Sequence, residues 1–96
     1  MPKVEVTYSG LIMQEIGRRR ELRELPHGAT LGDLLQTLER EHGEPVRDLL
    51  FDERRSLLSQ ALVAVNGTSV RDLAMPVGRD NAVVRILVMS PMMIGG

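Results

Sequence analysis

One segment of the sequence, residues 30–42, carries the pattern of an amphipathic helix. Its leucines recur at the spacing that aligns side chains along one side of a helix: Leu31, Leu34, Leu35 and Leu38. Thr30 and Asp33 have the three-residue separation of a capping box, and Gly43 is placed to end the helix. A helix with a single apolar side requires a second surface that buries it. We therefore expect this helix to lie on a sheet built from the rest of the chain.

The region before the helix has the pattern of a hairpin. In residues 3–9 apolar and polar side chains alternate, which indicates a strand with one buried face. Residues 18–25 are extended and strongly charged and end at Pro26, so we expect them to pair with the first strand. Between the two, residues 11–16 have apolar spacings that suit a short helical turn.

The region after the helix supplies the remaining strands. Residues 61–65 are an apolar run followed by Asn66-Gly67, the strongest short hairpin signal in the sequence, and residues 68–70 can begin the return limb. Residues 82–89 are almost all apolar apart from Arg85. This last run predicts a strand that is covered on both faces or lies centrally in the sheet.

Together these segments predict a small α+β protein. Residues 44–60 indicate a short helix after Pro45 and an exposed charged loop at 52–55. The order of elements favours a β-grasp (ubiquitin-like) fold, with a mixed sheet of four to five strands and one main helix packed on one face. A ferredoxin-like sandwich would need a second full helix, for which the segment around Leu49 is too short. We expect residues 1–96 to form a single domain.

The composition argues against several classes of function. Aromatic residues make up 2% of the chain and the net charge is −1, so the sequence has neither stacking platforms nor a field for nucleic acid or a membrane surface. Cysteine is absent, which excludes disulfides and a cysteine nucleophile. No apolar run approaches the length of a membrane span, and no signal-peptide pattern is present, so we expect a cytoplasmic protein.

Few residues carry a pattern typical of catalysis or ligand binding. His27 and His42 lack partners at metal-ligand spacing, and no phosphate-binding loop is present, so we expect neither a metal nor a cofactor bound by this chain. The only basic run, Arg18-Arg19-Arg20, has glutamates beside it and no interleaved aromatic residue. We interpret this run as a solvated strand face with cross-strand ion pairs rather than a phosphate site.

The last seven residues, 90–96, predict an extended, flexible tail. Pro91 resists helix and biases Ser90 toward an extended conformation. Gly95 and Gly96 have no side chains and form the narrowest tip that a polypeptide can present. Such a tip, with a terminal carboxylate, could enter a slot that larger residues would block. By itself the pair is also compatible with an unremarkable frayed end.

Three motifs, taken in order, resemble the MoaD/ThiS family of ubiquitin-like sulfur carriers. They are the run from Leu25 to Leu35 (LPHGATLGDLL), the Val63–Gly67 hairpin and the terminal Gly95-Gly96. The first run is most similar to the molybdopterin synthase small subunit branch. The tail departs from the family, which usually has a proline pair and small residues before the diglycine, whereas this chain reads Ser-Pro-Met-Met-Ile.

The resemblance implies that the chain is a carrier rather than an enzyme. A ubiquitin-activating-type adenylyltransferase would use ATP to adenylate Gly96, a sulfur donor would convert the adenylate to a thiocarboxylate, and an acceptor such as the molybdopterin synthase large subunit would take the sulfur. Gly95 would permit threading into the partner's site. The residues expected to guide the tail along the partner are Pro91, Met92, Met93 and Ile94.

Three alternatives stay open at this point. The carrier could serve cysteine, thiamine or tRNA thiolation instead. A ubiquitin-like modifier would be joined through Gly96 to lysines of target proteins, and lysine-linked chains of it could grow only through Lys3, the sole lysine. A β-grasp interaction domain with an inert tail is the third possibility.

Overall fold

The structure is a computed structural model that describes residues 1–90. It contains five strands and three helices in this part of the chain. In chain order they are β1 (Lys3–Gly10), α1 (Leu11–Ile16), β2 (Arg20–Glu24), α2 (Leu31–His42), α3 (Glu44–Leu50), β3 (Ala61–Val65), β4 (Thr68–Ser69) and β5 (Val83–Val88). The predicted helix, both hairpins and the final strand are thus confirmed with shifts of a residue or two.

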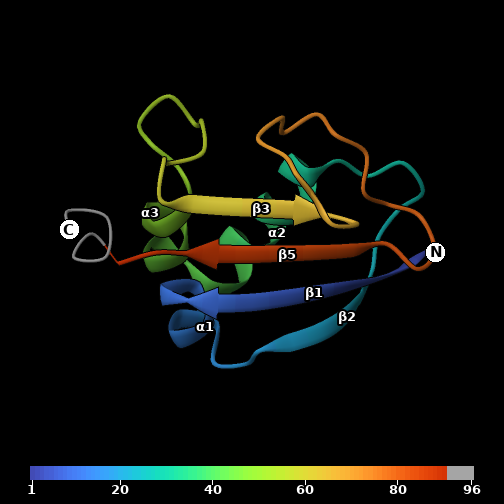
Figure 1. Cartoon of the computed structure of the whole chain (residues 1–96), viewed down its shortest axis with the longest axis horizontal. Coiled ribbons are helices and arrows are strands. Elements are labelled where there is room, and N and C mark those ends of the chain that lie inside the picture. The colour runs from blue at the N-terminus through green and yellow to red at the C-terminus, as the bar shows by residue number, and fades with distance from the viewer. Residues whose placement is uncertain (91–96) are drawn as a thin grey trace.

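The strands form one mixed sheet in the order β2-β1-β5-β3-β4. The first and last strands, β1 and β5, lie side by side in parallel, while β2 and β3 flank them in antiparallel orientation. All three helices lie on the same side of this sheet (Figure 1). The arrangement is the predicted β-grasp fold, and the β5 strand occupies its centre.

Helix α2 begins where the sequence predicts, because both halves of the capping box are formed. The Thr30 hydroxyl accepts a hydrogen bond from the Asp33 amide at 3.1 Å, and the Asp33 carboxylate accepts one from the Thr30 amide at 2.9 Å. These bonds satisfy two of the backbone amides that have no partner within a helix. The apolar side of the helix is buried against the sheet.

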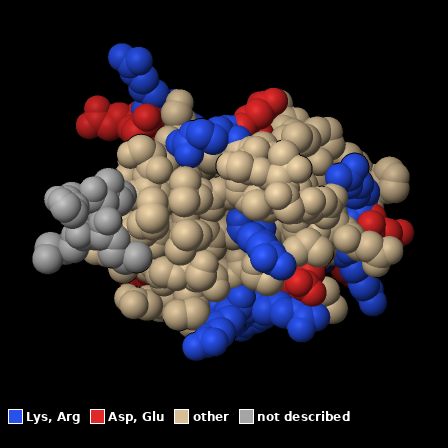
Figure 2. Space-filling model, viewed as in Figure 1, with Lys and Arg blue, Asp and Glu red and all other residues tan. Residues whose placement is uncertain are grey.

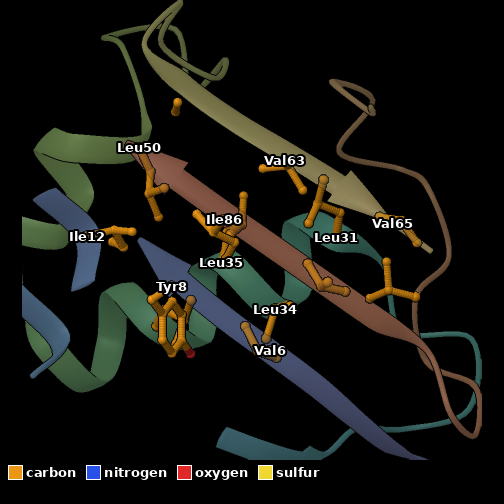
Figure 3. Packing of buried hydrophobic residues seen from close by; sticks show 14 of the residues in the cluster. Val6, Tyr8, Ile12, Leu31, Leu34, Leu35, Leu50, Val63, Val65 and Ile86 are labelled. Carbon is orange, nitrogen blue, oxygen red and sulfur yellow. The ribbon is translucent and has the colours of Figure 1, made fainter. Parts of the chain in front are cut away.

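The core lies between the sheet and the helices (Figure 3). Side chains from β1, α2 and β5 meet there, and they are fully or almost fully buried: Val4, Val6, Leu31, Leu34, Leu35, Leu38, Val84 and Ile86. Helices α1 and α3 close one end of this core through Ile12 and Leu50, neither of which is exposed. Aliphatic residues therefore fill the space that aromatic residues often occupy in small domains.

The segment from Leu25 to Thr30 docks the start of α2 onto the loop that precedes β5. The amides of Leu31 and Gly32 donate to the carbonyls of Met75 and Leu73, both at 2.8 Å. In the same contact the amide of Gly28 donates to the carbonyl of Gly78 at 2.9 Å. This part of the family-like motif thus has a structural role, because it ties two distant loops together.

The Asn66-Gly67 turn forms as predicted. Both residues have positive φ angles, 50° and 85°, which suit a tight hairpin turn between strands of normal twist. The side-chain oxygen of Asn66 also accepts a hydrogen bond from the Val83 amide at 2.9 Å, so the turn is joined to the start of β5.

Candidate functional site

The end of β5 is the point from which the chain continues toward its terminal glycines. Val88 pairs with Gly10 at the end of β1 and with Ala61 at the start of β3. One residue further, the Met89 amide donates a hydrogen bond to the Gln60 carbonyl at 3.0 Å. The backbone is therefore held by its neighbours as far as Met89, and we call Met89 and Ser90 the tail root.

A close backbone contact fixes this end of the sheet. Gly10 has a φ angle of +69°, and a Cβ atom placed on it would lie 2.1 Å from the Val88 carbonyl oxygen. Any larger residue would have to push β1 and β5 apart, because such a separation is far below van der Waals contact. Gly10 lets α1 follow β1 directly beside the tail root.

The predicted site residues Pro91, Met92, Met93, Ile94, Gly95 and Gly96 lie outside the described residues. Their roles stay predictions. The structure does show where the segment that precedes them lies, because Ser90 follows a strand in the middle of the sheet. The tail root emerges at one end of the molecule, beside α1 and α3 (Figure 1).

The side of the sheet opposite the helices is not covered by any element in residues 1–90. We call it the open face. Its residues alternate with the core residues along the strands and include Glu5, Thr7, Ser9, Leu22, Leu62, Ala64, Val83, Arg85 and Leu87. Figure 2 views the molecule from this side and shows a largely uncharged surface with basic groups near its middle and other charged groups around its margin. The open face therefore combines partly exposed aliphatic groups with few charges.

Aliphatic side chains of the open face lie at both of its ends: Leu62 and Leu87 near the tail root, and Leu22, which is 64% exposed, at the other end. Leu62 is 37% exposed, whereas most large aliphatic side chains of the chain are buried. Leu62 faces Leu87 across the β3–β5 pair, and a shallow hollow between the strands is lined by these two leucines together with Ser9, Ala64 and the exposed Arg85. A partly hollowed surface that exposes aliphatic groups and carries few charges is typical of a contact surface for another protein.

The basic run behaves largely as predicted. Arg20 forms an ion pair with Glu5 across the β1–β2 pair at 3.0 Å, and Arg18 pairs with Glu21 at 3.5 Å. For Arg19 no ion pair is seen within residues 1–90. These arginines are exposed, so their pairs contribute little to stability.

The structure shows a charged corner of the covered face that the sequence analysis did not identify. Glu21 and Arg23 point inward from the edge strand β2, and Arg23 forms ion pairs with both Glu21 and Glu41 of α2. The hydrogen bond from Arg23 lowers the pKa of Glu41. Only the alternation along residues 20–24, which places these two side chains opposite Leu22, could have indicated it.

Tyr8 lies beside this charged corner. Its ring is 3% exposed, and its hydroxyl has no hydrogen-bond partner in the described part of the chain. Burial, reinforced by the negative charge of Glu21, raises the pKa of the Tyr8 hydroxyl well above its usual value. The hydroxyl therefore stays protonated and neutral at ordinary pH.

We find no site with the composition of a catalytic or metal centre in residues 1–90. No group of three or more acidic, histidine or cysteine side chains in this range could hold a metal ion. His27 is exposed and His42 is half-buried, on separate elements. None of the helices described is long and apolar enough to cross a membrane. The tail root and the open face are therefore the features of residues 1–90 that we consider as a site for a partner protein.

Comparison with known proteins supplies an independent indication. The model of the ThiS family matches residues 6–89. No curated protein matches the sequence. Among solved structures, a Pyrococcus furiosus protein described as molybdopterin converting factor, subunit 1, is 29% identical, with a TM-score of 0.73 over 94% of this chain and 100% of that one.

Two further structures share the fold at lower identity. Small archaeal modifier protein 1 of Haloferax volcanii is 18% identical, with a TM-score of 0.78 over 94% of this chain and 100% of that one. A chain of the Amycolatopsis orientalis BexX/CysO complex is 23% identical, with a TM-score of 0.71 over 91% of this chain and 96% of that one. At these identities the likeness concerns the fold alone.

Proposed function

Because this chain belongs to the ThiS family, we propose that it is a sulfur carrier that works through the carboxylate of Gly96. The observation that carries this proposal is the family match over residues 6–89, which ends at the tail root. The sequence beyond the root has the narrow diglycine that the chemistry needs. The chain itself contributes the reacting carboxylate and a surface for partners, and it has no catalytic role of its own.

The proposed chemistry takes place on a partner enzyme. A carboxylate is a poor acylating group, so an adenylyltransferase of the ubiquitin-activating type joins the Gly96 carboxylate to the AMP part of ATP and releases pyrophosphate. A donor that supplies sulfur as sulfide attacks the acyl carbon, AMP leaves, and the thiocarboxylate results. A persulfide donor would instead form an acyl disulfide as AMP leaves, and a second thiol would cleave its S–S bond to release the thiocarboxylate and a new disulfide. The partner supplies the nucleotide site, and nothing in this chain needs to bind ATP.

We propose that the activating enzyme contacts the open face. The face lies beside the tail root, so one partner can hold the sheet and receive the tail at the same time. Leu62 and Leu87 present apolar area that is already partly exposed, so covering it costs little and removes it from water. Residues Pro91, Met92, Met93 and Ile94 then line the path between the face and the enzyme's active site.

The acceptor that the comparisons favour is the large subunit of a molybdopterin synthase. The support is the 29% identity over almost the whole chain to the protein described as molybdopterin converting factor, subunit 1. A second candidate function is protein modification, favoured by the likeness in fold to small archaeal modifier protein 1. In that case the activated Gly96 would acylate a lysine amine, with loss of AMP or of an enzyme thiol.

The two functions differ in the mass of the product. The chain would be produced together with an activating enzyme and a sulfur donor and then weighed intact. A carrier gains the difference between one sulfur and one oxygen atom, and a modifier appears in adducts with other proteins. A variant without Gly96 is the matched control, and it should fold normally yet gain no sulfur. If the full chain is unchanged with both partners active, the proposal is wrong.

A further inference from the structure

Arg71 stands out because its guanidinium group binds only backbone carbonyls among the described residues. One nitrogen donates to the Ala61 carbonyl at 3.1 Å, and the other donates to the carbonyls of Leu57 and Leu58 at 2.8 and 2.9 Å. No carboxylate in residues 1–90 forms an ion pair with it. The charge and planar fork of an arginine are therefore used to hold a single turn, residues 57–61.

That turn is the segment that holds the tail root. The carbonyl of Gln60, near its end, accepts the hydrogen bond from the Met89 amide at 3.0 Å. Ala61, at its end, pairs with Val88 and begins β3. Figure 1 shows the loop before β3 at the same end of the sheet as the end of β5. A displacement of the turn would consequently displace the residue from which the tail starts.

Besides Arg71, the turn is anchored at its two ends, because Leu57 and Ala61 are buried and Leu57 forms a bridge with Phe51. Its internal hydrogen bond runs from the Ala61 amide to the Leu58 carbonyl at 3.0 Å, and the Leu58 amide donates to the Leu50 carbonyl at 2.9 Å. Ser59 is exposed and Gln60 is half-buried, so side-chain packing at its tip is slight. Arg71, which is not part of the turn, binds three of the turn's carbonyls. The position of Arg71 is fixed by the preceding residue, Val70, which is buried and whose amide forms a hydrogen bond with β3.

We propose that Arg71 is a positioning residue for the activation of Gly96. By fixing the 57–61 turn, it fixes the Gln60 carbonyl and so the place and direction in which the chain leaves the sheet. The activating enzyme must receive the carboxylate in line with its nucleotide, and small errors in such placement are costly in rate. The effect of Arg71 on activation rests on the proposed function, whereas its effect on the position of the tail root does not.

The structural part is tested on the chain alone by amide hydrogen exchange. We expect Arg71→Ala to raise the exchange rate of the Met89 amide by roughly ten-fold or more, while the Val84 amide near the start of β5 changes little. Arg71→Lys keeps the charge but loses the fork, and it should also raise the Met89 rate. Arg79→Ala removes an exposed positive charge far from the turn and should change neither amide.

The catalytic part is tested by the kinetics of Gly96 adenylation. We expect Arg71→Ala to lower kcat about ten-fold with little change in KM, because the open face that binds the enzyme is intact while the carboxylate is misplaced. An unchanged Met89 exchange rate would overturn the inference, whatever the kinetics. An equal rise in the exchange rates of Val84 and Met89 would mean a general loss of stability and would also overturn the inference. A raised Met89 exchange rate with an unchanged kcat would overturn it as well.

Failure of the proposed function would give a different result. The wild-type chain would then not be adenylated under any condition, whereas the exchange experiment, which needs no partner, would still show whether Arg71 holds the tail root.

Discussion

The two faces of the sheet use the same strands for opposite purposes. Along β5, Val84, Ile86 and Val88 are buried under the helices, whereas the alternate residues Val83, Arg85 and Leu87 face away from them. The covered face holds the fold together, and the open face keeps apolar area at the surface beside the tail root. If the open face binds the activating enzyme as proposed, stability and partner binding depend on alternate residues of one strand, and each can be changed with little effect on the other.

The covered face should show the largest effect on stability. Leu35 of α2 is fully buried in the core, and its replacement by alanine leaves a cavity as well as losing transfer free energy. We expect Leu35→Ala to lower the free energy of unfolding by about 2–5 kcal/mol in urea titrations. The matched control is Leu62→Ala on the open face, which should cost less than about 1 kcal/mol. Equal losses at the two positions would contradict the comparison.

The open face should show its effect in activation rather than in stability. Leu62→Glu places a charge where the activating enzyme is proposed to bury an apolar group, and carboxylates are costly to bury unpaired. We expect kcat/KM for Gly96 adenylation to fall at least ten-fold, which is about 1.4 kcal/mol, with an unfolding midpoint close to that of the wild type. Thr68→Glu, an exposed change on the edge strand β4, is the control for added charge. If both variants are activated normally, the enzyme binds elsewhere.

The charged corner of the covered face should make a smaller and pH-dependent contribution. Arg23 lowers the pKa of Glu41 below its ordinary value, so the stabilisation is present above that ordinary value and is lost as the pH falls through the lowered one. The pair is partly exposed, and we expect well under about 1 kcal/mol. In urea titrations, the difference in the free energy of unfolding between Glu41→Gln and the wild type should be largest near neutral pH and should vanish in acid. Glu15→Gln, which removes an exposed carboxylate on α1 that forms no ion pair in residues 1–90, is the control.

The smallest effect is expected at the Tyr8 hydroxyl. Because this buried group has no hydrogen-bond partner among the described residues, removing it relieves a desolvation cost. We expect Tyr8→Phe to be neutral or to stabilise the protein by up to about 1 kcal/mol in the same titrations. Tyr8→Leu, which removes the ring, should destabilise it clearly. A loss of stability in the phenylalanine variant would mean that the hydroxyl makes a bond in solution.

Much of the fold could be predicted from the sequence because its signals are local. The capping box of Thr30 and Asp33, the leucine spacing of α2 and the Asn66-Gly67 turn depend on residues a few positions apart, and each formed as predicted. The candidate site was predicted less completely. The diglycine could be identified in the sequence, but it and the residues predicted to guide the tail lie beyond the described range. The open face was not predicted.

The sequence by itself determined which segments become helix or strand, which side of each is apolar, and that the chain closes on two glycines. Tertiary structure alone decided what meets across the chain. Gly10 contacts the Val88 carbonyl and Arg71 reaches Leu57, although many positions separate the partners in each case. No periodicity encodes such contacts, because they arise only when the sheet brings distant strand ends together. For the same physical reason, a sequence pattern can show that the residues of β5 alternate but cannot show which face the helices leave open.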